Sequence, residues 1–462
     1  DGDGLISIEV NASTVETLVD NRGLVKADGG TAILTAKGAS DALAGVVNNS
    51  GTMQARTLKK SKGRSLLLGD MGNGVTHVAG TLDASAPEGG GGGFIETSAA
   101  SVKVADEAVI TTRSADGDTG TWLIDPKDFT VAAAGGDITG AALSAQLTGH
   151  NVRIESVSGA SEGNGDIFVI DGISWSENVL TLAAERDIVI GAELLGSGTA
   201  GLALEYGLSA PAAGNTAGYV VDAPVNLAST GSFSTKLGSD GATIGYTIIT
   251  GLGNESSSGD GTLQGIRGNL AGNYVLGSNI DASATSGWNS GEGFIPIGTA
   301  YSSPFSGTFD GLGHEIFDLS MTRPSADGQG LFSYTQGAVL RNLRMINSRI
   351  EGNNNVGALV GNASGSLTIE NIWSDGKVTG QGNNIGGVLG GMSGSGALIF
   401  HDIRESGDVS GNYYVGGVLG YIYTYGNSSI KNISSSGNIN SSSGYSGGLF
   451  GYIYMHGGHG RI

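Results

Sequence analysis

Short apolar motifs return at near-constant spacing in the last third of the chain, from Gly328 to Ile462. Four copies of one motif are Val356-Gly-Ala-Leu-Val-Gly361, Ile385-Gly-Gly-Val-Leu-Gly390, Val415-Gly-Gly-Val-Leu-Gly420 and Ser446-Gly-Gly-Leu-Phe-Gly451, and Gly330-Leu-Phe-Ser333 is a degenerate copy before them. The equivalent apolar positions are Leu331, Leu359, Val388, Val418 and Leu449, with spacings of 28, 29, 30 and 31 residues. A fixed period in this range is typical of a solenoid.

Two further patterns keep the same period. One places Asn or Asp before an aliphatic residue, at Asn342, Asn371, Asp402 and Asn432, and the other ends alternating runs at Ile350, Val378, Val409 and Ile439. We therefore expect three short strands per coil, with coils stacked about 4.8 Å apart. Stacking should place the aliphatic side chains over one another and form a hydrogen-bonded Asn/Asp column. The doubled glycines, such as Gly386-Gly387, should mark tight corners with positive φ or close approach of coils.

Sequence patterns typical of β-strands also occur in the residues before Gly328. Gly23, Gly51 and Gly80 open similar Gly-x-apolar-x-Ala motifs 28 and 29 residues apart. We predict an all-β, right-handed parallel β-helix, drawn out as an elongated rod on the order of 75–110 Å. Its predicted segments are a block over 1–115, a block over 116–245 that ends in a weaker Ala/Ser/Gly stretch, a transition over 246–327, and repeats over 328–462.

Composition supports a thin core with many turns. The 462 residues include 84 Gly and 7 Pro, and 14% are charged, against about 25% in a typical domain. The net charge is −20; the first 329 residues contain 37 acidic and 16 basic residues, a net of −21, and the remainder contains 6 and 7. An acidic chain without a basic cluster disfavours nucleic acid and anionic membranes as partners.

Several kinds of chemistry are excluded or left without support. Cysteine is absent, which excludes disulfides and thiolate metal sites. No run of 18 apolar residues occurs, so we expect no membrane insertion. No signal peptide is evident, and the repeat-like text at both ends suggests an internal segment of a longer protein. We expect no cofactor and no metal site.

A more specific pattern lies between Gly92 and Pro126. Gly92-Gly-Phe-Ile-Glu-Thr-Ser98 is followed by Trp122-Leu-Ile-Asp-Pro126. This pair of motifs resembles the β-helices of two-partner-secretion exoproteins, the filamentous-haemagglutinin-like and high-molecular-weight adhesins. Residues 328–462 resemble GLUG-type repeats of large bacterial surface proteins. The resemblance implies secretion through an outer-membrane transporter partner and an adhesive role.

Parallel β-helices also include polysaccharide-active enzymes, which need clustered carboxylates on adjacent coils. The best candidates form two groups: Asp310, His314, Glu315 and Asp318; and His401, Asp402, Arg404, Glu405 and Asp408. No such set recurs on neighbouring coils, and a surface ion pair is the simpler interpretation of the Arg404-Glu405 pair. We therefore predict that the protein is not an enzyme and has no catalytic residues.

Tyrosine is the candidate binding chemistry. Eight of the 14 tyrosines lie between Tyr413 and Tyr454. Tyr421 and Tyr452 occupy equivalent repeat positions, as do Tyr423 and Tyr454, so stacking should produce two tyrosine columns on one face. Tyrosine combines an apolar ring with a polar tip, which suits contact with sugars and proteins. The alternative is that these rings only cover a wide corner of the solenoid.

Together these patterns predict part of a secreted bacterial adhesin, at the cell surface and associated with the outer membrane. Its expected partners are carbohydrate or protein on host cells, neighbouring cells or biofilm matrix, bound by many weak sites acting together. Two alternatives remain: a passive stalk of a contact-dependent toxin exoprotein, and a polysaccharide-active β-helix enzyme.

Overall fold

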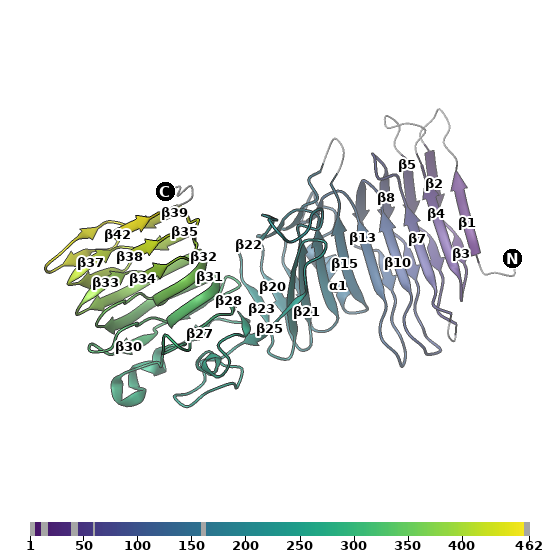
Figure 1. The fold of residues 1–462 in the computed structure, drawn as a ribbon. Coiled ribbons are helices and arrows are strands. Elements are labelled where there is room, and N and C mark those ends of the chain that lie inside the picture. Colours follow the sequence, from purple (N-terminus) through teal and green to yellow (C-terminus); the bar gives the residue numbers. More distant parts are fainter. Residues whose placement is uncertain (1–4, 11–16, 38–44, 59–60, 159–162, 457–462) are drawn as a thin grey trace. The chain divides into compact units, whose positions relative to one another are not determined.

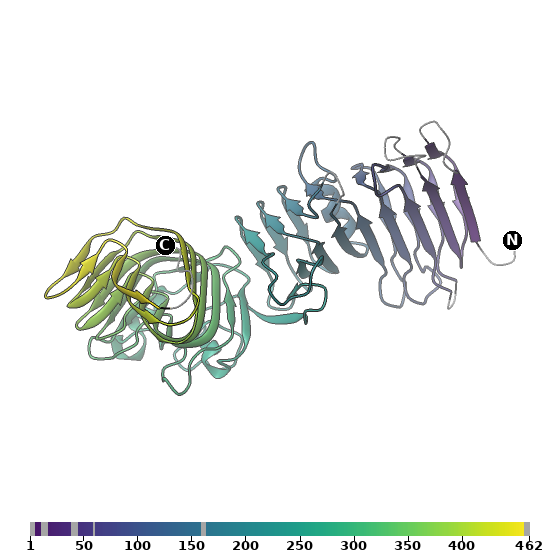
Figure 2. The same ribbon diagram turned by 45° about the horizontal axis from the view of Figure 1, so that its top comes forward.

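The structure is a computed structural model that describes residues 5–10, 17–37, 45–58, 61–158 and 163–456 (Figure 1). It divides into two compact units, Asp1–Gly245 and Tyr246–Ile462. Nearly all regular structure in both units is β, and the strands pair in parallel with partners about one coil away in sequence. Figure 2 shows the coils of each unit from a second direction. The predicted fold class, an all-β parallel solenoid, is confirmed.

One face of unit 1 is a ladder of parallel strands that runs through the whole unit. The burial pattern of its strands explains their formation: in β4, Ala32, Leu34 and Ala36 are buried and the threonines and Ile33 between them face outward. Such alternation places every second side chain in the core. The strands are β1 (Leu5–Val10), β4 (Thr31–Ala36), β7 (Arg64–Leu68), β10 (Phe94–Ser98), β13 (Thr121–Asp125), β15 (Asn151–Ser156), β18 (Val179–Ala184), β21 (Gly201–Tyr206) and β24 (Ser232–Leu237).

Four shorter ladders make the other faces of unit 1. The first is β2 (Thr17–Asn21), β5 (Gly45–Asn49), β8 (Val75–Val78) and β11 (Ser101–Val104); the second is β3 (Leu24–Lys26), β6 (Thr52–Gln54), β9 (Thr81–Asp83) and β12 (Val109–Thr111). The third is β14 (Phe129–Val131), β16 (Ile167–Val169), β19 (Ile188–Ile190) and β22 (Tyr219–Val221); the fourth is β17 (Ile173–Trp175), β20 (Leu194–Gly196) and β23 (Val225–Leu227).

A helix, α1 (Gly140–Leu147), interrupts the stack of unit 1 and packs against β12, β15 and β17. This helix departs from the strands predicted for the segment 116–245. Its residues are mostly Ala, Leu and Gln, which favour helix, and the Thr139 hydroxyl accepts a hydrogen bond from the Ala142 N–H as an N-cap. The Gln146 side-chain amide donates to the Ala108 carbonyl at 2.9 Å, which ties the helix to the preceding coil.

The two motifs between Gly92 and Pro126 form adjacent rungs of the long ladder. Strand β10 pairs with β13 so that Ile95 lies beside Trp122, and both are fully buried. The Trp122 indole N–H donates to the Thr97 hydroxyl at 3.1 Å. The Trp and Thr of these motifs are therefore explained by packing and by one buried hydrogen bond between coils.

Unit 2, together with the strand β25 that begins at the end of unit 1, contains shorter strands and single-turn helices followed by the repeats. The first part contains β25 (Ile244–Ile249), η1 (Gln264–Gly268), β26 (Asn273–Leu276), β27 (Ile280–Asp281), η2 (Ser283–Gly287), η3 (Asn289–Gly291), β28 (Thr308–Asp310), β29 (Glu315–Phe317) and β30 (Ser320–Thr322). The repeats contain β31 (Phe332–Gly352), β32 (Val360–Gly380), β33 (Asn383–Gly386), β34 (Leu389–Gly394), β35 (Leu398–Glu405), β36 (Asp408–Gly411), β37 (Tyr413–Gly416), β38 (Leu419–Thr424), β39 (Ser429–Ser435), β40 (Ile439–Ser441), β41 (Ser446–Gly447) and β42 (Phe450–Met455).

The predicted period corresponds to one coil. The Leu359 N–H donates to the Val388 carbonyl at 3.1 Å, and the Val388 N–H donates to the Val418 carbonyl at 2.9 Å. All three side chains are fully buried. Each repeat therefore completes the core that its neighbour leaves open, as predicted for a solenoid.

The predicted Asn/Asp column is also present, and it makes the corners. Asn342, Asn371, Asp402 and Asn432 all have positive φ, between 50° and 57°. The Asn371 amide donates to the Asn342 side-chain oxygen at 3.0 Å, and the Asn432 amide donates to Asp402 at 2.9 Å. Asn and Asp tolerate this left-handed conformation better than other residues with a Cβ.

The doubled glycines are required by close approach of coils. A Cβ on Gly387 would lie 2.2 Å from the Gly417 carbonyl oxygen, and one on Gly417 would lie 2.3 Å from that of Gly448. A side chain cannot fit at these distances.

Candidate ligand-binding face

The two predicted tyrosine columns form on the outer side of β38 and β42. In register, Tyr421 lies beside Tyr452 and Tyr423 beside Tyr454. The ring centroids are 5.1 Å apart in the first pair and 4.9 Å in the second, and the rings are 12° and 14° from parallel. Ile422 between them points into the core and is fully buried. The alternation of β38 thus places both columns on one outer face.

Stacking determines which parts of these rings a ligand can reach. One face of each ring is covered by its partner in the column. The residues in register on the preceding strand, Gly391 and Ser393, are small, so no ring continues the columns on that side. The face therefore offers hydroxyl groups, ring edges and ring surface on the side of Gly391 and Ser393, rather than one broad aromatic plane.

Three more tyrosines extend the columns around a corner that the sequence reasoning missed. The Tyr414 ring packs against Tyr421 at 5.4 Å and Tyr452 at 5.2 Å, and it is nearly parallel to Tyr445 at 5.9 Å. Tyr413 packs edge-on against Tyr414 and Tyr445, at 4.5 and 5.4 Å. We call the set Tyr413, Tyr414, Tyr421, Tyr423, Tyr425, Tyr445, Tyr452 and Tyr454 the tyrosine face.

The backbone at this corner is adapted to the rings. Tyr414 occupies the place held by Asn355 and Asn384 in earlier coils, where the Asn384 amide donates to the Asn355 side-chain oxygen at 2.8 Å. Like them it has positive φ, 52°, which is uncommon for a bulky residue. A Cβ on Gly444 would lie 1.9 Å from the Tyr413 ring. The replacement of an Asn pair by Tyr413-Tyr414 was the sequence signal for this corner.

Tyr425 and His456 complete the other end of the face. The Tyr425 ring is perpendicular to that of Tyr423, and the hydroxyls of Tyr423 and Tyr425 share a hydrogen bond. His456 lies edge-on to Tyr425 at 5.8 Å. The exposed fractions of Tyr425, Tyr445 and Tyr454 are 48%, 62% and 40%, so the face is open to solvent along its length.

Two hydroxyls of this face, those of Tyr421 and Tyr423, have a raised pKa and stay protonated to higher pH than an ordinary tyrosine. Burial, and then the neighbouring Tyr452 and Tyr414, raise the pKa of Tyr421. The hydrogen bond with Tyr425 raises the pKa of Tyr423. The phenols can therefore donate hydrogen bonds to ligand oxygens at neutral and moderately basic pH.

The carboxylates proposed for an enzyme have structural partners. Asp310 is fully buried and accepts from the Arg341 side chain at 2.9 Å and from the Asn342 amide at 3.0 Å. A His314 ring nitrogen lies 3.1 Å from the Asn279 side-chain oxygen. These groups stabilise corners of the coils instead of meeting as an acid and a base.

The interpretation of Arg404-Glu405 as a surface ion pair was wrong. Arg404 is exposed, whereas Glu405 is 4% exposed, because neighbouring residues of a strand point to opposite faces. Glu405 accepts from the Ser435 hydroxyl at 2.7 Å and from the Gly407 N–H at 2.6 Å. Burial raises the pKa of Glu405 to about 7, although these hydrogen bonds act in the opposite direction.

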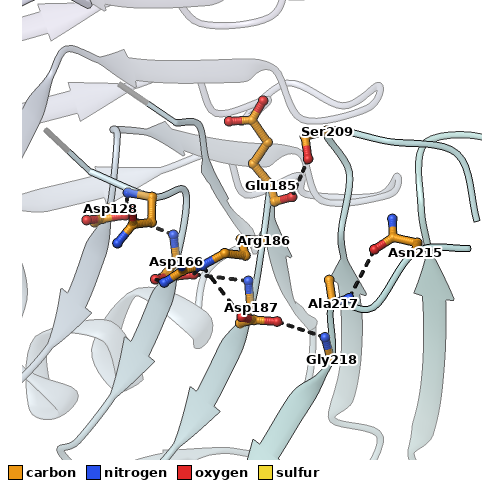
Figure 3. A network of polar contacts seen from close by, with 10 residues as sticks. Asp128, Asp166, Glu185, Arg186, Asp187, Ser209, Asn215, Ala217 and Gly218 are labelled. Atoms are coloured by element: carbon orange, nitrogen blue, oxygen red, sulfur yellow. Dashed lines mark hydrogen bonds and ion pairs between the residues drawn. The ribbon is translucent and has the colours of Figure 1, made fainter. Parts of the chain in front are cut away.

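Aspartates in unit 1 connect successive coils through hydrogen bonds from backbone N–H groups to their carboxylates (Figure 3). The Asp128 carboxylate accepts from the Asp166 N–H at 2.9 Å, Asp166 from the Asp187 N–H at 3.1 Å, and Asp187 from the Gly218 N–H at 2.8 Å. The Arg186 side chain also donates to Asp166, at 2.7 Å from its Nε. Some of the acidic side chains of unit 1 therefore accept hydrogen bonds from backbone N–H groups of neighbouring coils.

Part of this chain is similar to a family other than the one that the motifs suggested. The matching family model describes the M26 IgA1-specific metallo-endopeptidase N-terminal region and covers residues 254–376. This range includes most of the transition segment, from residue 254, and the first of the repeats predicted to be of GLUG type. The motifs between Gly92 and Pro126 lie outside it.

Relatives of known name fall into two groups. Halomucin of Haloquadratum walsbyi is 44% identical over 126 residues, which is 27% of this chain and 1% of halomucin. The immunoglobulin A1 proteases of Streptococcus sanguinis and Streptococcus pneumoniae are each 26% identical over 163 residues, 35% of this chain and 8% of the proteases. A solved structure of a candidate immunoglobulin A1 protease from Bacteroides ovatus is 19% identical, with a TM-score of 0.30, and the match covers 42% of this chain and 67% of that one.

The prediction that the protein is not an enzyme is contradicted by the match to the metallo-endopeptidase family model and by the two streptococcal relatives, which point to a protease family. The prediction was wrong because it considered only clustered carboxylates inside the solenoid. The similarity to the proteases lies instead in the sequence of the solenoid coils, which need no such cluster. The chain spans between 1% and 8% of the curated relatives it matches.

The described residues do not fit the metal that an endopeptidase of this family implies. Among them, no group of three or more His, Cys, Asp or Glu side chains is placed to hold a metal ion. His314-Glu315 is the single His-Glu pair of the sequence, and Asp318 stands where an H-E-x-x-H motif needs its second His. We assign no catalytic step to these residues. In the same described part, no helix is long and apolar enough to cross a membrane.

Proposed function

We propose that this chain is an extracellular binding segment of a protein related to the IgA1 proteases, and that the tyrosine face attaches it to a glycan or protein. The main observation is the set of eight tyrosines, in which Tyr413 and Tyr414 replace an Asn pair of the preceding coil and Tyr414 keeps a positive φ that is uncommon for a bulky residue. Strain of this kind persists where the surrounding structure maintains it and is concentrated at functional sites.

One observation supports an extracellular location: the relatives include immunoglobulin A1 proteases, whose name refers to a secreted substrate. The finer assignment, an adhesin of the filamentous-haemagglutinin type exported through an outer-membrane transporter, depends on the motifs between Gly92 and Pro126.

A glycan array with the 462-residue chain tests the proposal. We expect binding by the wild type and loss of at least about tenfold in affinity, roughly 1.4 kcal/mol, when Tyr421, Tyr423, Tyr452 and Tyr454 are all changed to Ala. Tyr301→Ala is the matched control, because Tyr301 is 68% exposed in the same unit but lies outside the tyrosine face. Circular dichroism should show that all three proteins are folded. Equal binding by all three would place the ligand site elsewhere.

The family match supports a protein ligand as a second candidate. The matched region, residues 254–376, belongs to unit 2, which also carries the tyrosine face. We propose that immunoglobulin A1 is a candidate protein partner. Surface plasmon resonance with immobilised immunoglobulin A1 and the same three proteins tests this, and no binding by the wild type would contradict it.

A further inference from the structure

The tyrosine columns are also placed to react with each other. We propose that Tyr423 and Tyr454 form a dityrosine cross-link when a haem peroxidase and hydrogen peroxide oxidise the protein, so that two successive coils become covalently joined. The pair is held by the parallel pairing of β38 and β42, which continues on both sides of it. The centroids of the two rings are 4.9 Å apart and the rings are 14° from parallel.

The reaction balances with one peroxide per cross-link. Each phenol loses one electron and its hydroxyl proton, which gives two phenoxyl radicals with spin density at the ring carbons beside the oxygen. One such Cε of Tyr423 bonds to one of Tyr454. The hydrogens on these carbons then move to the oxygens as both rings regain aromaticity. The product has lost two hydrogen atoms, and the peroxide accepts the two electrons and two protons to become two molecules of water.

The stacked arrangement suits the bond-forming step. The new carbon–carbon bond begins at nearly a right angle to both ring planes, because the spin density lies above and below each ring. Two nearly parallel rings on adjacent strands present these lobes to each other. Two rings packed edge-on do not point these lobes at each other.

Three further features favour the reaction at this pair. Tyr454 is 40% exposed, so an oxidant can reach it. The hydroxyl of Tyr423 shares a hydrogen bond with that of Tyr425, which helps to hold the Tyr423 ring in its stacked position, and the phenol proton is released to solvent when the electron leaves. The chain contains no cysteine, the side chain that most readily reduces a tyrosyl radical.

The pair Tyr421 and Tyr452 is stacked as well but is more restricted. Tyr414 packs against both rings, at 5.4 and 5.2 Å. A cross-linked pair must turn from stacked rings toward a twisted biaryl, and a third ring in contact with both opposes that rotation. We therefore assign the cross-link to Tyr423 and Tyr454.

Peptide mapping tests the assignment. The full chain, at a concentration low enough to suppress contact between molecules, is treated with horseradish peroxidase and hydrogen peroxide and then digested. We expect dityrosine fluorescence and one major cross-linked species that joins the peptides containing Tyr423 and Tyr454, with a mass two hydrogens below their sum. The thermal midpoint of the oxidised protein should rise, because the bond closes a loop of about 30 residues.

The chain offers its own controls. Tyr301, which is 68% exposed, forms a pair with the half-buried Tyr334 whose ring centroids are 6.2 Å apart and whose rings are nearly perpendicular, at 82°; this pair should not cross-link. Tyr454→Phe keeps the stacked ring but cannot form a phenoxyl radical, so it should lose the cross-linked species and the shift in thermal midpoint. The proposal is overturned if dityrosine is absent, if it joins Tyr421 to Tyr452, or if the Tyr301–Tyr334 and intermolecular products are as abundant.

Discussion

Tyr414 combines a residue type and a backbone conformation that rarely occur together. In earlier coils the same place is held by Asn355 and Asn384, which also have positive φ but extend a hydrogen-bonded ladder. A tyrosine at this position cannot extend the side-chain hydrogen-bond ladder, but it adds a ring that contacts Tyr421 and Tyr452. The exchange indicates a surface whose composition is not explained by stability alone.

Restoring asparagine should therefore separate stability from binding. We predict that Tyr414→Asn raises the free energy of unfolding by about 1 kcal/mol, because Asn relieves part of the left-handed strain and can accept from or donate to Asn384. The same variant should weaken ligand binding to the tyrosine face. Chemical denaturation checks the first effect. Tyr445→Asn, at a position without positive φ, is the control and should show no such gain.

Because of Glu405, the free energy of unfolding of unit 2 should be lower at basic pH than at acidic pH. Its folded pKa is about 7 and the ordinary value is 4.5, so the folded state favours the protonated acid. The stabilisation is complete below about pH 4.5 and is lost as the pH rises through about 7. We predict that Glu405→Gln raises the stability at pH 8 by up to about 3 kcal/mol and changes it little at pH 4. Thermal unfolding at the two pH values measures this; equal shifts at both would contradict it.

At the scale of elements, periodicity predicted the repeats of unit 2 and the positions of their corners. The aliphatic positions and the Asn/Asp column follow directly from a fixed register, because one coil repeats the environment of the last. The corner formed by Tyr413, Tyr414 and Tyr445 was not predicted, since it depends on side chains that meet only when two loops are folded. The burial of Glu405 was likewise hidden, because an acid next to an arginine suggests a surface position.

The helix α1 was missed for a different reason. Its sequence, Gly140-Ala-Ala-Leu-Ser-Ala-Gln-Leu147, has small apolar residues compatible with either structure, and its surroundings suggested strands. The cap at Thr139 is a local signal that favours helix. A solenoid can accept a helix in one coil when the element still offers a buried side, here Leu143 and Leu147.

Loss of this cap should destabilise unit 1 modestly. The Thr139 hydroxyl accepts from the Ala142 N–H at 3.1 Å and donates to Asp106 at 2.7 Å. We predict that Thr139→Ala lowers the free energy of unfolding by about 1 kcal/mol. Thr139→Ser retains the hydroxyl and should remain close to the wild type. Denaturant titration of both variants distinguishes the cap from a general effect of substitution at this site.

At the scale of the whole molecule, net charge should control stability. The chain carries −20, and residues 1–245 contain 29 acidic and 14 basic residues, a net of −15. Like charges repel in the folded state more than in the expanded one. We predict that the thermal midpoint rises between about 0.01 M and about 1 M NaCl, as the Debye length falls from about 30 Å to about 3 Å. A neutral osmolyte series is the control for exclusion effects, and a falling midpoint would mean that ion pairs such as Arg56–Asp83 outweigh the repulsion.

The helix α1 also lies at a boundary between two parts of unit 1 that we expect to unfold locally at different rates. Only the ladder from β1 to β24 continues from the preceding coil into the coil that contains the helix. In the described residues the ladders of β11 and β12 end before this coil, the ladder of β14 begins in it, and the ladder of β17 begins after it. In a linear array, an opening spreads as far as the coupling between neighbours carries it. Amide hydrogen exchange in unit 1 should therefore proceed in two blocks that open independently, so that damage at one end leaves the other end folded.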